Sequence, residues 1–386
     1  MEKMDNLDLK NVRDQIDAID QQMVELFSRR MELAGQTGLY KKERGLPLTD
    51  PARERAKLKT VSAMAGEKMS RYIAQLYSMM FNLSKAYEAE LINEGNEIGD
   101  AINNALDSTA KEFPDFCTVA CQGVEGAYSQ IACSRLFQFP EIVYYKTWEE
   151  VFTAIEEGKC RYGVLPIENS TAGSVYGVYD LMKKHKFSIV RAVRLKVDHC
   201  LVAKKGVAMG DIREVISHEQ AISQCAGFIK SLGNVKVTVC ANTAMAARTV
   251  AESGRSDIAA LSSRDCARLY GLDILDEGVQ DQGDNYTRFI CISKNLEIYP
   301  GADKTSIMLI AAHQPGALYK ILSRFYALGI NLTKLESRPI PNRSFEFMFY
   351  FDIEKSVYSP DFIKMIGELG ELSDRYEYLG SYSEVI

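Results

Sequence analysis

Apolar positions in the first 90 residues recur in steps of three and four, the period of an α-helix. One stripe of a long helix would carry Val12, Ile16, Ile19, Met23, Leu26 and Leu33. Arg30 lies on the same stripe, and Lys41 follows eleven residues later, so both cations share one face about 16 Å apart. Arginine and lysine are almost never fully buried alone. Two interpretations therefore stay open: both side chains reach solvent at the rim of a bundle, or the bundle surrounds a small polyanion.

Two further helices are predicted before residue 93. Asp50 has the character of an N-cap and Pro51 that of a first helical residue. The opening turns of this second helix would carry two charged residues, Arg53 and Glu54. A third helix is predicted from about Glu67 by the apolar stripe Met69, Ile73, Leu76, Met80, Leu83 and Tyr87. Beside this stripe, one above the other at i and i+4, are Ser84 and Glu88.

From residue 116 the pattern changes to short apolar strands, each followed by a polar turn and a helical segment. Such strands are predicted at residues 117–121, 162–165, 215–216, 237–240 and 258–261. Repeated strand–helix units indicate parallel sheets with helices on both faces, and their ligand sites lie beyond the carboxyl ends of the strands. Helix N-termini at that edge offer unpaired N–H groups and a positive dipole end, which suits carboxylate ligands.

The C-terminal segment alternates strand and helix patterns in the order βαββαβ, which predicts a ferredoxin-like sandwich. Strands are expected at residues 305–311, 330–335, 345–352 and 376–382, and helices at 315–329 and 360–372. Polar stretches with glycine, asparagine and proline predict linkers at residues 96–115 and 295–304. We therefore expect a helical domain at 1–95, an α/β domain at 116–295 and an α+β tail domain at 303–386.

Length and charge bound the class of protein. At 386 residues the chain is too long for one core, and about three domains are expected. A net charge of −6 without a basic stripe argues against nucleic-acid binding. No apolar run approaches the ~20 residues that cross a bilayer, and the charged start at residues 1–10 lacks the hydrophobic stretch of a signal peptide. A cytoplasmic protein is expected, with no membrane partner.

Cysteine and histidine usage gives no sign of a metal centre. The nine cysteines are irregularly spaced without a C-x-x-C pair, and the four histidines are scattered, a pattern typical of reduced, buried packing residues. The sequence also has no G-x-G-x-x-G motif in its strand–helix units and no P-loop, which argues against a nicotinamide dehydrogenase. We expect neither a metal nor an organic cofactor.

Several features of the helical segment occur together. They are Arg13, the run Arg29-Arg30-Met31-Glu32-Leu33-Ala34, Gly38 with Lys41, the segment Asp50-Pro51-Ala52-Arg53-Glu54, and the Ser84/Glu88 pair. In this combination, residues 8–92 resemble the all-helical chorismate mutase family. The match implies that the catalytic residues are Arg13, Arg30, Lys41 and Glu88, and that the substrate pocket also contains Asp50, Arg53, Glu54 and Ser84. The family places glutamine or glutamate at the Glu88 position, and a glutamate donates a hydrogen bond only when protonated.

Five motifs of the middle segment also occur together: Gly123-x-x-Gly126-x-Tyr128-Ser129, Pro166-Ile167-Glu168-Asn169-Ser170 with Gly173, His199-Cys200-Leu201, Ser217-His218-x-Gln220-Ala221 and Asn285-Tyr286-Thr287-Arg288-Phe289. With them, residues 116–294 resemble prephenate dehydratase, a two-lobed α/β domain of the periplasmic-binding-protein type. The lobes would be residues 116–194 with 285–294, and residues 195–284. The match implies that Thr287 is catalytic and that substrate is bound by Asn169, Ser170, Thr171, Ser217, His218 and Gln220.

The chemistry of that family fits these residue types. Prephenate loses its ring hydroxyl and its ring carboxylate together, and aromatisation drives the step without a cofactor. A threonine hydroxyl is too weak an acid to be a strong proton source alone, so Thr287 is expected to donate a hydrogen bond to the leaving oxygen. Glu168 and His218 are candidate acids or relays. Arg288 alternates with Thr287 along its strand, and it forms either a salt bridge behind the sheet or a substrate contact.

Two segments of the tail domain, Pro315-Gly316-Ala317-Leu318 and Leu335-Glu336-Ser337-Arg338-Pro339, follow the expected order of elements. With them, residues 303–386 resemble the ACT domain. In dehydratases of this kind the two segments bind phenylalanine between two ACT domains, which implies an allosteric site at Gly316, Ala317, Leu318, Glu336, Ser337 and Arg338. Tyr319 departs from the usual apolar residue, a change expected to alter effector choice or affinity. The alternative is a folded domain that only supports dimerisation.

Together the three resemblances predict a bifunctional enzyme that converts chorismate through prephenate to phenylpyruvate and is inhibited by L-phenylalanine. A homodimer or higher oligomer is expected: Arg13 and Arg30 are seventeen residues, about 25 Å, apart along one helix, so one chorismate would need both ends of two antiparallel helices. Two alternatives stay open. The chain is a non-catalytic, two-lobed amino-acid sensor, or its dehydratase substrate is arogenate.

Overall fold

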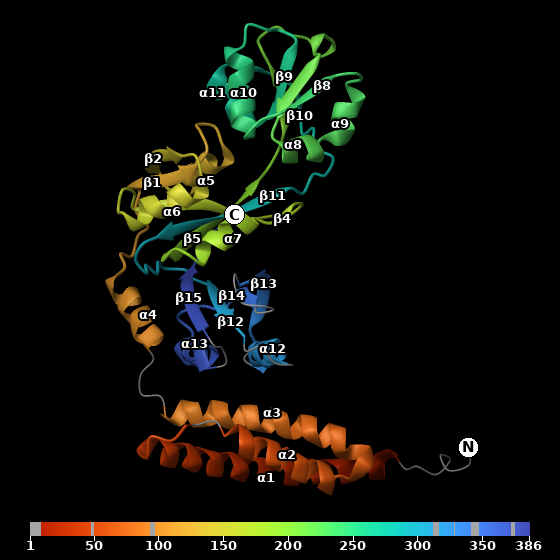
Figure 1. Cartoon of the computed structure of the whole chain (residues 1–386), viewed down its shortest axis with the longest axis vertical. Coiled ribbons are helices and arrows are strands. Elements are labelled where there is room, and N and C mark those ends of the chain that lie inside the picture. Colours follow the sequence, from red (N-terminus) through yellow and green to blue (C-terminus); the bar gives the residue numbers. More distant parts are fainter. Residues whose placement is uncertain are drawn as a thin grey trace, which may run out of the picture. The chain divides into compact units, whose positions relative to one another are not determined.

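The computed structural model describes residues 9–47, 50–92, 97–311, 316–327, 329–340, 347–371 and 375–386. The chain divides into two compact units, one ending at Glu97 and one beginning at Ile98 (Figure 1). The described residues of the first unit form three helices, α1 Leu9–Glu43, α2 Pro51–Met64 and α3 Gly66–Ile92. The three predicted helices of this segment are therefore confirmed.

Small residues and a cap shape the helical unit. α3 packs on both α1 and α2, and two glycines of α1 allow a close approach. A Cβ atom on Gly35 would lie 2.6 Å from Leu91 Cδ1, and one on Gly38 would lie 3.0 Å from the Cβ atom of Glu88. The predicted cap of α2 is also present, because the Asp50 carboxylate accepts the backbone N–H of Arg53 at 3.0 Å.

The apolar stripe of α1 lies on the surface of the chain. Ile19 is 55% exposed, Met23 50% and Leu26 66%, and the one buried apolar side chain among the described residues of this unit is Val61. The periodicity thus predicted the helix correctly, but this stripe is not a core within one chain. A contiguous apolar face of this length is typical of an interaction surface.

The expectation of a linker at residues 96–115 is wrong for its first half. Helix α4 spans Glu97–Ser108, and its side chains Ile102 and Ala105 are buried in the core of the tail domain. Ile98 and Leu106 pack against the same core. These four residues follow the i, i+4, i+7, i+8 spacing of an amphipathic helix, a signal hidden by the polar composition around them.

The first lobe of the second unit is one mixed sheet in the order β16-β5-β11-β3-β1-β2, with β4 paired to β3. Its strands are β1 Phe116–Gln122, β2 Phe139–Tyr145, β3 Tyr162–Asn169, β4 Gly173–Ser174, β5 Ser188–Lys196, β11 Tyr286–Ser293 and β16 Glu384–Val385, and its helices are α5 Tyr128–Leu136, α6 Trp148–Glu156 and α7 Tyr176–Met182. The prediction of parallel sheets is correct for only part of this lobe: β1 pairs in parallel with β2 and β3, but the returning strand β11 runs antiparallel to both β3 and β5.

The second lobe has its own sheet in the order β10-β6-β9-β7-β8. Its strands are β6 Cys200–Ala203, β7 Glu214–Ser217, β8 Lys236–Val239, β9 Ile258–Ser262 and β10 Asp273–Glu277. Its helices are α8 Glu219–Gln224, α9 Ala226–Ser231, α10 Thr243–Glu252 and α11 Arg264–Tyr270, with a 3₁₀ turn at Met209–Asp211. Only β7, β8 and β9 pair in parallel. The chain therefore passes between the two sheets twice, after β5 and before β11, close to the predicted lobe boundaries.

The tail domain has the predicted βαββαβ order, with β12 Lys304–Ile310, α12 Ala317–Ala327, β13 Asn331–Pro339, β14 Phe347–Glu354, α13 Phe362–Glu371 and β15 Arg375–Tyr382. Its antiparallel sheet runs β13-β14-β12-β15, the arrangement of a ferredoxin-like sandwich. Pro315, the first residue of the Pro315-Gly316-Ala317-Leu318 segment, lies outside the described residues.

Both faces of the tail sheet are buried. On one face Ile307 and Phe351 join the core formed with α4, α12 and α13. On the other face Met308 and Tyr350 join a core that also contains α6 and α7 of the first lobe. The chain then returns to that lobe, where β16 adds a short parallel strand to β5. The tail domain is therefore packed onto the first lobe, and Figure 1 shows β12, β14 and β15 directly beside β5 and α7.

Candidate active sites

The helical unit brings four of the predicted mutase residues together. Arg30 Nη1 donates to Ser84 Oγ at 2.6 Å, and Lys41 Nζ lies 3.4 Å from Glu88 Oε2. Ser84 and Glu88 are both buried, whereas Arg30 and Lys41 are partly exposed. The cations of the α1 stripe are thus paired with polar groups of α3, and they line one face between the two helices.

The remaining predicted mutase residues lie apart from this group or have other partners. Glu54 forms an ion pair with Lys85 at 3.0 Å. Asp50 caps α2 by accepting the backbone N–H of Arg53. The Arg53 side chain itself is exposed. Arg13 is exposed near the opposite end of α1. Within one chain, the Arg30 and Lys41 cations and the Glu88 carboxyl group therefore lie toward one end of α1. Arg13 lies toward the other end.

In the two-lobed unit, the catalytic candidate Thr287 belongs to a partly buried network of amides and hydroxyls, of which Asn169 and Asn285 are buried. Thr287 on β11 is the register partner of Asn169 on β3, and Asn169 Nδ2 donates to Thr287 Oγ1 at 2.9 Å. The same amide nitrogen donates to Asn285 Oδ1 at 2.7 Å. Asn169 Oδ1 accepts the hydroxyl of Thr171 at 2.8 Å and two backbone N–H groups. Asn169 is therefore held rigidly against Thr287.

The network continues into the second lobe. Asn285 Nδ2 donates to Gln224 Oε1 at 3.0 Å, and Gln224 Nε2 donates to Thr171 Oγ1 at 2.9 Å. His199 Nε2 lies 3.1 Å from the same Gln224 oxygen, so it carries the proton and donates. Burial lowers the pKa of His199 below its usual value, which keeps the ring neutral at pH 7. These bonds tie the lobes together where the chain passes between them.

The direction of these hydrogen bonds determines what Thr287 can do. Asn169 Nδ2 is a donor, so Thr287 Oγ1 accepts from it. The hydroxyl proton of Thr287 is then available to a further acceptor. A group that accepts from one side and donates on the other suits a hydrogen bond to a leaving oxygen.

Among the predicted substrate residues, Ser170 also lies beside Thr287. Its hydroxyl accepts the backbone N–H of Tyr286 at 2.9 Å and donates to the Asp284 carbonyl at 2.8 Å. Ser217 is buried and donates to the carbonyl of Leu261. His218 caps α8 by accepting the backbone N–H of Gln220 through Nδ1. The structure shows no bond between these second-lobe residues and the Thr287 network.

The candidate acid Glu168 lies on the other face of the sheet. Successive residues of a strand point to opposite faces, and Glu168 pairs in register with Arg288, as Asn169 does with Thr287. The Glu168 carboxylate instead contacts Lys334 Nζ of the tail domain at 2.8 Å. Alternation along β3 therefore separates Glu168 from Thr287, and the structure does not bring this candidate acid or relay to the Thr287 hydroxyl. Arg288 takes the salt-bridge alternative, to Asp352 and Glu384.

Alternation also divides the allosteric candidates. Lys334, Glu336 and Arg338 face the first lobe: Glu336 accepts from Ser174, and Arg338 pairs with Asp180 at 2.8 Å. Ser337 is exposed and pairs in register with Phe349, which packs on the helix side of the sheet. Leu318 packs on that side too, beside Ala317 at the start of α12. Gly316 precedes them with a φ of 83°, a conformation that favours glycine.

Three polar residues of the network were missed as site residues, namely His199, Gln224 and Asn285. His199 and Asn285 lie within the quoted motifs, at the two places where the chain passes between the sheets. A rule that polar residues lie in the site where the chain crosses between two lobes would have selected both as candidate site residues. Gln224 ends α8 and carries no comparable local signal.

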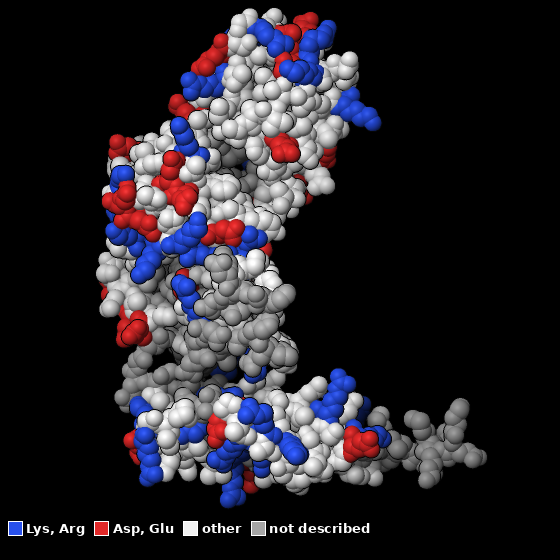
Figure 2. Space-filling model, viewed as in Figure 1, with Lys and Arg blue, Asp and Glu red and all other residues white. Residues whose placement is uncertain are grey.

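The surface and the composition of the described residues add three observations. Figure 2 shows lysine, arginine, aspartate and glutamate side chains interspersed over the visible face of the two lobes. Every helix in the part of the chain that the structure describes is too short or too polar to span a bilayer. Over the same residues, no three histidine, cysteine, aspartate or glutamate side chains are grouped as metal ligands.

Comparison with known proteins agrees with this division of the chain. The family model of chorismate mutase type II matches residues 12–89, and that of prephenate dehydratase matches residues 119–297. The chain is 31% identical to the bifunctional chorismate mutase/prephenate dehydratase of Escherichia coli (strain K12) over 382 residues, which covers 96% of this chain and 95% of the relative.

Two further similarities each cover about two thirds of the chain. The chain is 38% identical to arogenate dehydratase 2 of Petunia hybrida over 281 residues, covering 68% of this chain and 71% of the relative. It also resembles the crystal structure of prephenate dehydratase from Arthrobacter aurescens in complex with L-Phe. The TM-score is 0.63 at 27% identity, covering 69% of this chain and 89% of that one.

Proposed function

The chain belongs to the bifunctional chorismate mutase/prephenate dehydratases, and from this premise we propose which residues carry its two reactions and how they are regulated. The enzyme rearranges chorismate to prephenate, and it decarboxylates and dehydrates prephenate to phenylpyruvate. The mutase site is assigned to the helical unit and the dehydratase site to the cleft between the two lobes. All nine cysteines are free of disulfides, which supports a reducing, cytoplasmic location.

Thr287 is the catalytic hydrogen-bond donor of the dehydratase. The bond between the ring and its carboxylate breaks, the electron pair enters the ring, and carbon dioxide leaves. The bond from the ring to the hydroxyl breaks at the same time, and the departing hydroxide takes a proton from solvent to become water. Negative charge grows on that oxygen, where the Thr287 proton is aimed. The single observation that supports this role is the Asn169 amide donating to Thr287 Oγ1.

The mutase pocket is formed by two chains. The rearrangement is pericyclic and needs a cationic clamp with donors at the ether oxygen, where negative charge develops. Arg30 and Lys41 supply cations at one end of α1, and Arg13 lies about 25 Å away along the helix. An antiparallel partner helix would bring its own Arg13 to the first pair. The exposed apolar stripe of α1 supports such a partner, because a dimer would cover it.

Glu88 is the second hydrogen-bonding group of the mutase pocket. Its carboxyl group lies beside Lys41, and either a carboxylic acid or an amide at this position can donate a hydrogen bond to the ether oxygen. Glu88→Gln should therefore retain mutase activity, and a loss of chorismate consumption in this variant contradicts the role.

L-Phenylalanine is the feedback inhibitor, and it binds the tail domain between α12 and β13. The conformation of Gly316 opens backbone groups at the start of α12, and Ser337 offers an exposed hydroxyl on the same side of the sheet. The L-Phe found in the Arthrobacter aurescens protein supports this ligand. Glu336 and Arg338, which face the first lobe, would then transmit the binding rather than contact phenylalanine.

The test of this regulation is an inhibition curve for the dehydratase with prephenate and increasing phenylalanine. Loss of one hydrogen bond to the ligand in Ser337→Ala should raise the half-inhibitory concentration about tenfold, while the protein still forms phenylpyruvate. Tyr358→Ala, at an exposed position of the tail domain outside α12 and β13, serves as the control. An unchanged curve for Ser337→Ala would place the phenylalanine site elsewhere.

Arogenate is the second candidate substrate, because arogenate dehydratase 2 of Petunia hybrida is 38% identical over 281 residues. Arogenate carries an ammonium on the side chain where prephenate has a keto group. Fusion of the mutase, which produces prephenate, favours prephenate. Purified enzyme supplied separately with chorismate, prephenate and arogenate distinguishes the two, and the absence of any product from all three would favour the non-catalytic amino-acid sensor.

A further inference from the structure

A short hairpin carries the polar groups that surround Thr287. β3 ends at Asn169, β4 spans Gly173–Ser174, and the turn between them contains Ser170 and Thr171. Across this hairpin Glu168 pairs in register with Ser174, and Asn169 with Gly173. The side chains of Glu168 and Ser174 therefore stand next to one another, on the face opposite Thr287.

One lysine of the tail domain bridges the two strands of this hairpin. Lys334 Nζ lies 2.8 Å from Glu168 Oε1 and 2.7 Å from Ser174 Oγ. The Ser174 hydroxyl donates to Glu336, two residues along the same tail strand. The Lys334 side chain is only 14% exposed, so this ion pair is better shielded than a surface one.

Backbone pairing is weak where this bridge acts. The register between β11 and β3 shifts between Arg288 and Phe289, so Phe289 pairs with Pro166 and Ile167 is left out of the ladder. Pro166 has no N–H to donate, and β4 contributes only two residues. Bulges of this kind re-aim side chains near active sites. The end of β3 that carries Asn169 thus depends on side-chain contacts to keep its position.

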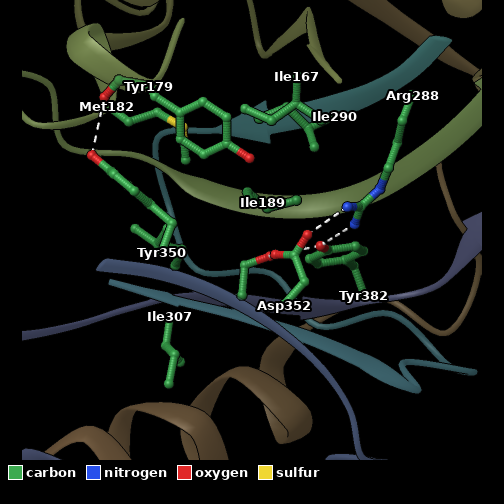
Figure 3. Close-up of a pocket in the computed structure, with 12 residues that line it drawn as sticks. Ile167, Tyr179, Met182, Ile189, Arg288, Ile290, Ile307, Tyr350, Asp352 and Tyr382 are labelled. Carbon is green, nitrogen blue, oxygen red and sulfur yellow. Dashed lines mark hydrogen bonds and ion pairs between the residues drawn. The ribbon is translucent and has the colours of Figure 1, made fainter. Parts of the chain in front are cut away.

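The tail domain holds the partner strand β11 in the same way. Arg288, the neighbour of Thr287, donates to Tyr382 at 2.7 Å and forms ion pairs with Asp352 and Glu384. Figure 3 shows Arg288 reaching from β11 to Asp352 and Tyr382 of the tail sheet. These three residues line a small cavity between the first lobe and the tail domain. Both strands that meet at the Asn169–Thr287 hydrogen bond are therefore fixed from behind by tail residues.

We propose that Lys334 is a positioning residue for the dehydratase reaction. It acts through Glu168 and Ser174, and it touches neither substrate nor Thr287. By joining the two strands of the hairpin it keeps Asn169 Nδ2 within hydrogen-bond distance of Thr287 Oγ1. The tail domain thereby completes the dehydratase site even when no effector is bound.

Lys334→Met tests this assignment, because it keeps the length of the side chain and removes the ammonium. A displacement of Asn169 should lower kcat for prephenate about tenfold to a hundredfold with little change in KM, since the lost interaction serves the transition state. The mutase rate of the same protein is the internal standard. Lys334→Arg should recover most of kcat. Lys159→Met is the matched control: it breaks an exposed lysine–glutamate pair of the first lobe, and its kcat should equal that of wild type.

Three results would overturn the proposal. The first is a kcat of Lys334→Met within twofold of wild type, and the second is a loss that appears in KM alone. The third comes from a double-mutant cycle, in which the effects of Lys334→Met and Glu168→Gln on kcat are additive. If Lys334 acts through Glu168, the two substitutions are strongly non-additive. Should Lys334→Met fail to fold, as judged by its thermal transition, Ser174→Ala takes its place. That variant removes one of the two partners without a change of charge, so it must lower kcat severalfold, and an unchanged kcat counts against the proposal.

Discussion

Thr287→Val is expected to abolish the formation of phenylpyruvate from prephenate and to leave the mutase rate of the same protein unchanged. Valine keeps the shape of threonine and removes the hydroxyl, so the strand and its packing are preserved. The loss should be about a hundredfold to a thousandfold in kcat, or ~3–4 kcal/mol, the range found when a donor to a developing oxyanion is removed. The mutase is unaffected because its residues lie in the other compact unit.

Thr287→Ser is the matched control for this prediction. Serine restores a hydroxyl to which Asn169 can still donate, so its kcat should lie much closer to wild type than that of the valine variant. Both reactions are followed with purified protein, the mutase by consumption of chorismate and the dehydratase by appearance of phenylpyruvate. A valine variant that forms phenylpyruvate at a near-normal rate would remove Thr287 from the mechanism.

Local signals predicted most of the elements because the physical cause of each element is local. The proline at position 51 with its aspartate cap, the apolar stripes of α1 and α3 and the strand and helix patterns of the tail all act over a few residues. Helix α4 was not predicted because its stripe of apolar residues is short and lies among polar ones. Strand β16 was not predicted because its two residues pair with β5, about 190 positions away, and no local pattern encodes that contact.

Only those residues of the dehydratase site that lie in the quoted motifs could be predicted from the sequence. Asn169 and Thr287 lie in the quoted motifs, and their contact follows once β3 and β11 are known to be paired. The position of Glu168 could also have been predicted. Alternation along β11 places Arg288 on the face opposite Thr287, and alternation along β3 places Glu168 on the face opposite Asn169. Lys334 could not be found this way, because its contact with Glu168 joins residues 166 positions apart through packing of two domains.

An equimolar mixture of Arg13→Ala and Arg30→Ala chains is expected to recover mutase activity that neither variant has alone. Each variant should lose about a hundredfold or more in kcat/KM, because each removes a cation that binds charge in the transition state. In a dimer with shared pockets, each pocket takes Arg13 from one chain and Arg30 from the other. A mixed dimer then contains one pocket with both arginines and one pocket with neither.

The expected size of the recovery follows from random assembly. Half of the dimers in an equimolar mixture are mixed, and one of their two pockets is intact, so about a quarter of wild-type activity should return. The two chains are unfolded and refolded together, or expressed together with different tags, and the mixed dimers are isolated through both tags. Isolated mixed dimers should reach about half of the wild-type rate. If they stay as inactive as the single variants, Arg13 and Arg30 act within one chain, and the exposed apolar stripe of α1 serves some other contact.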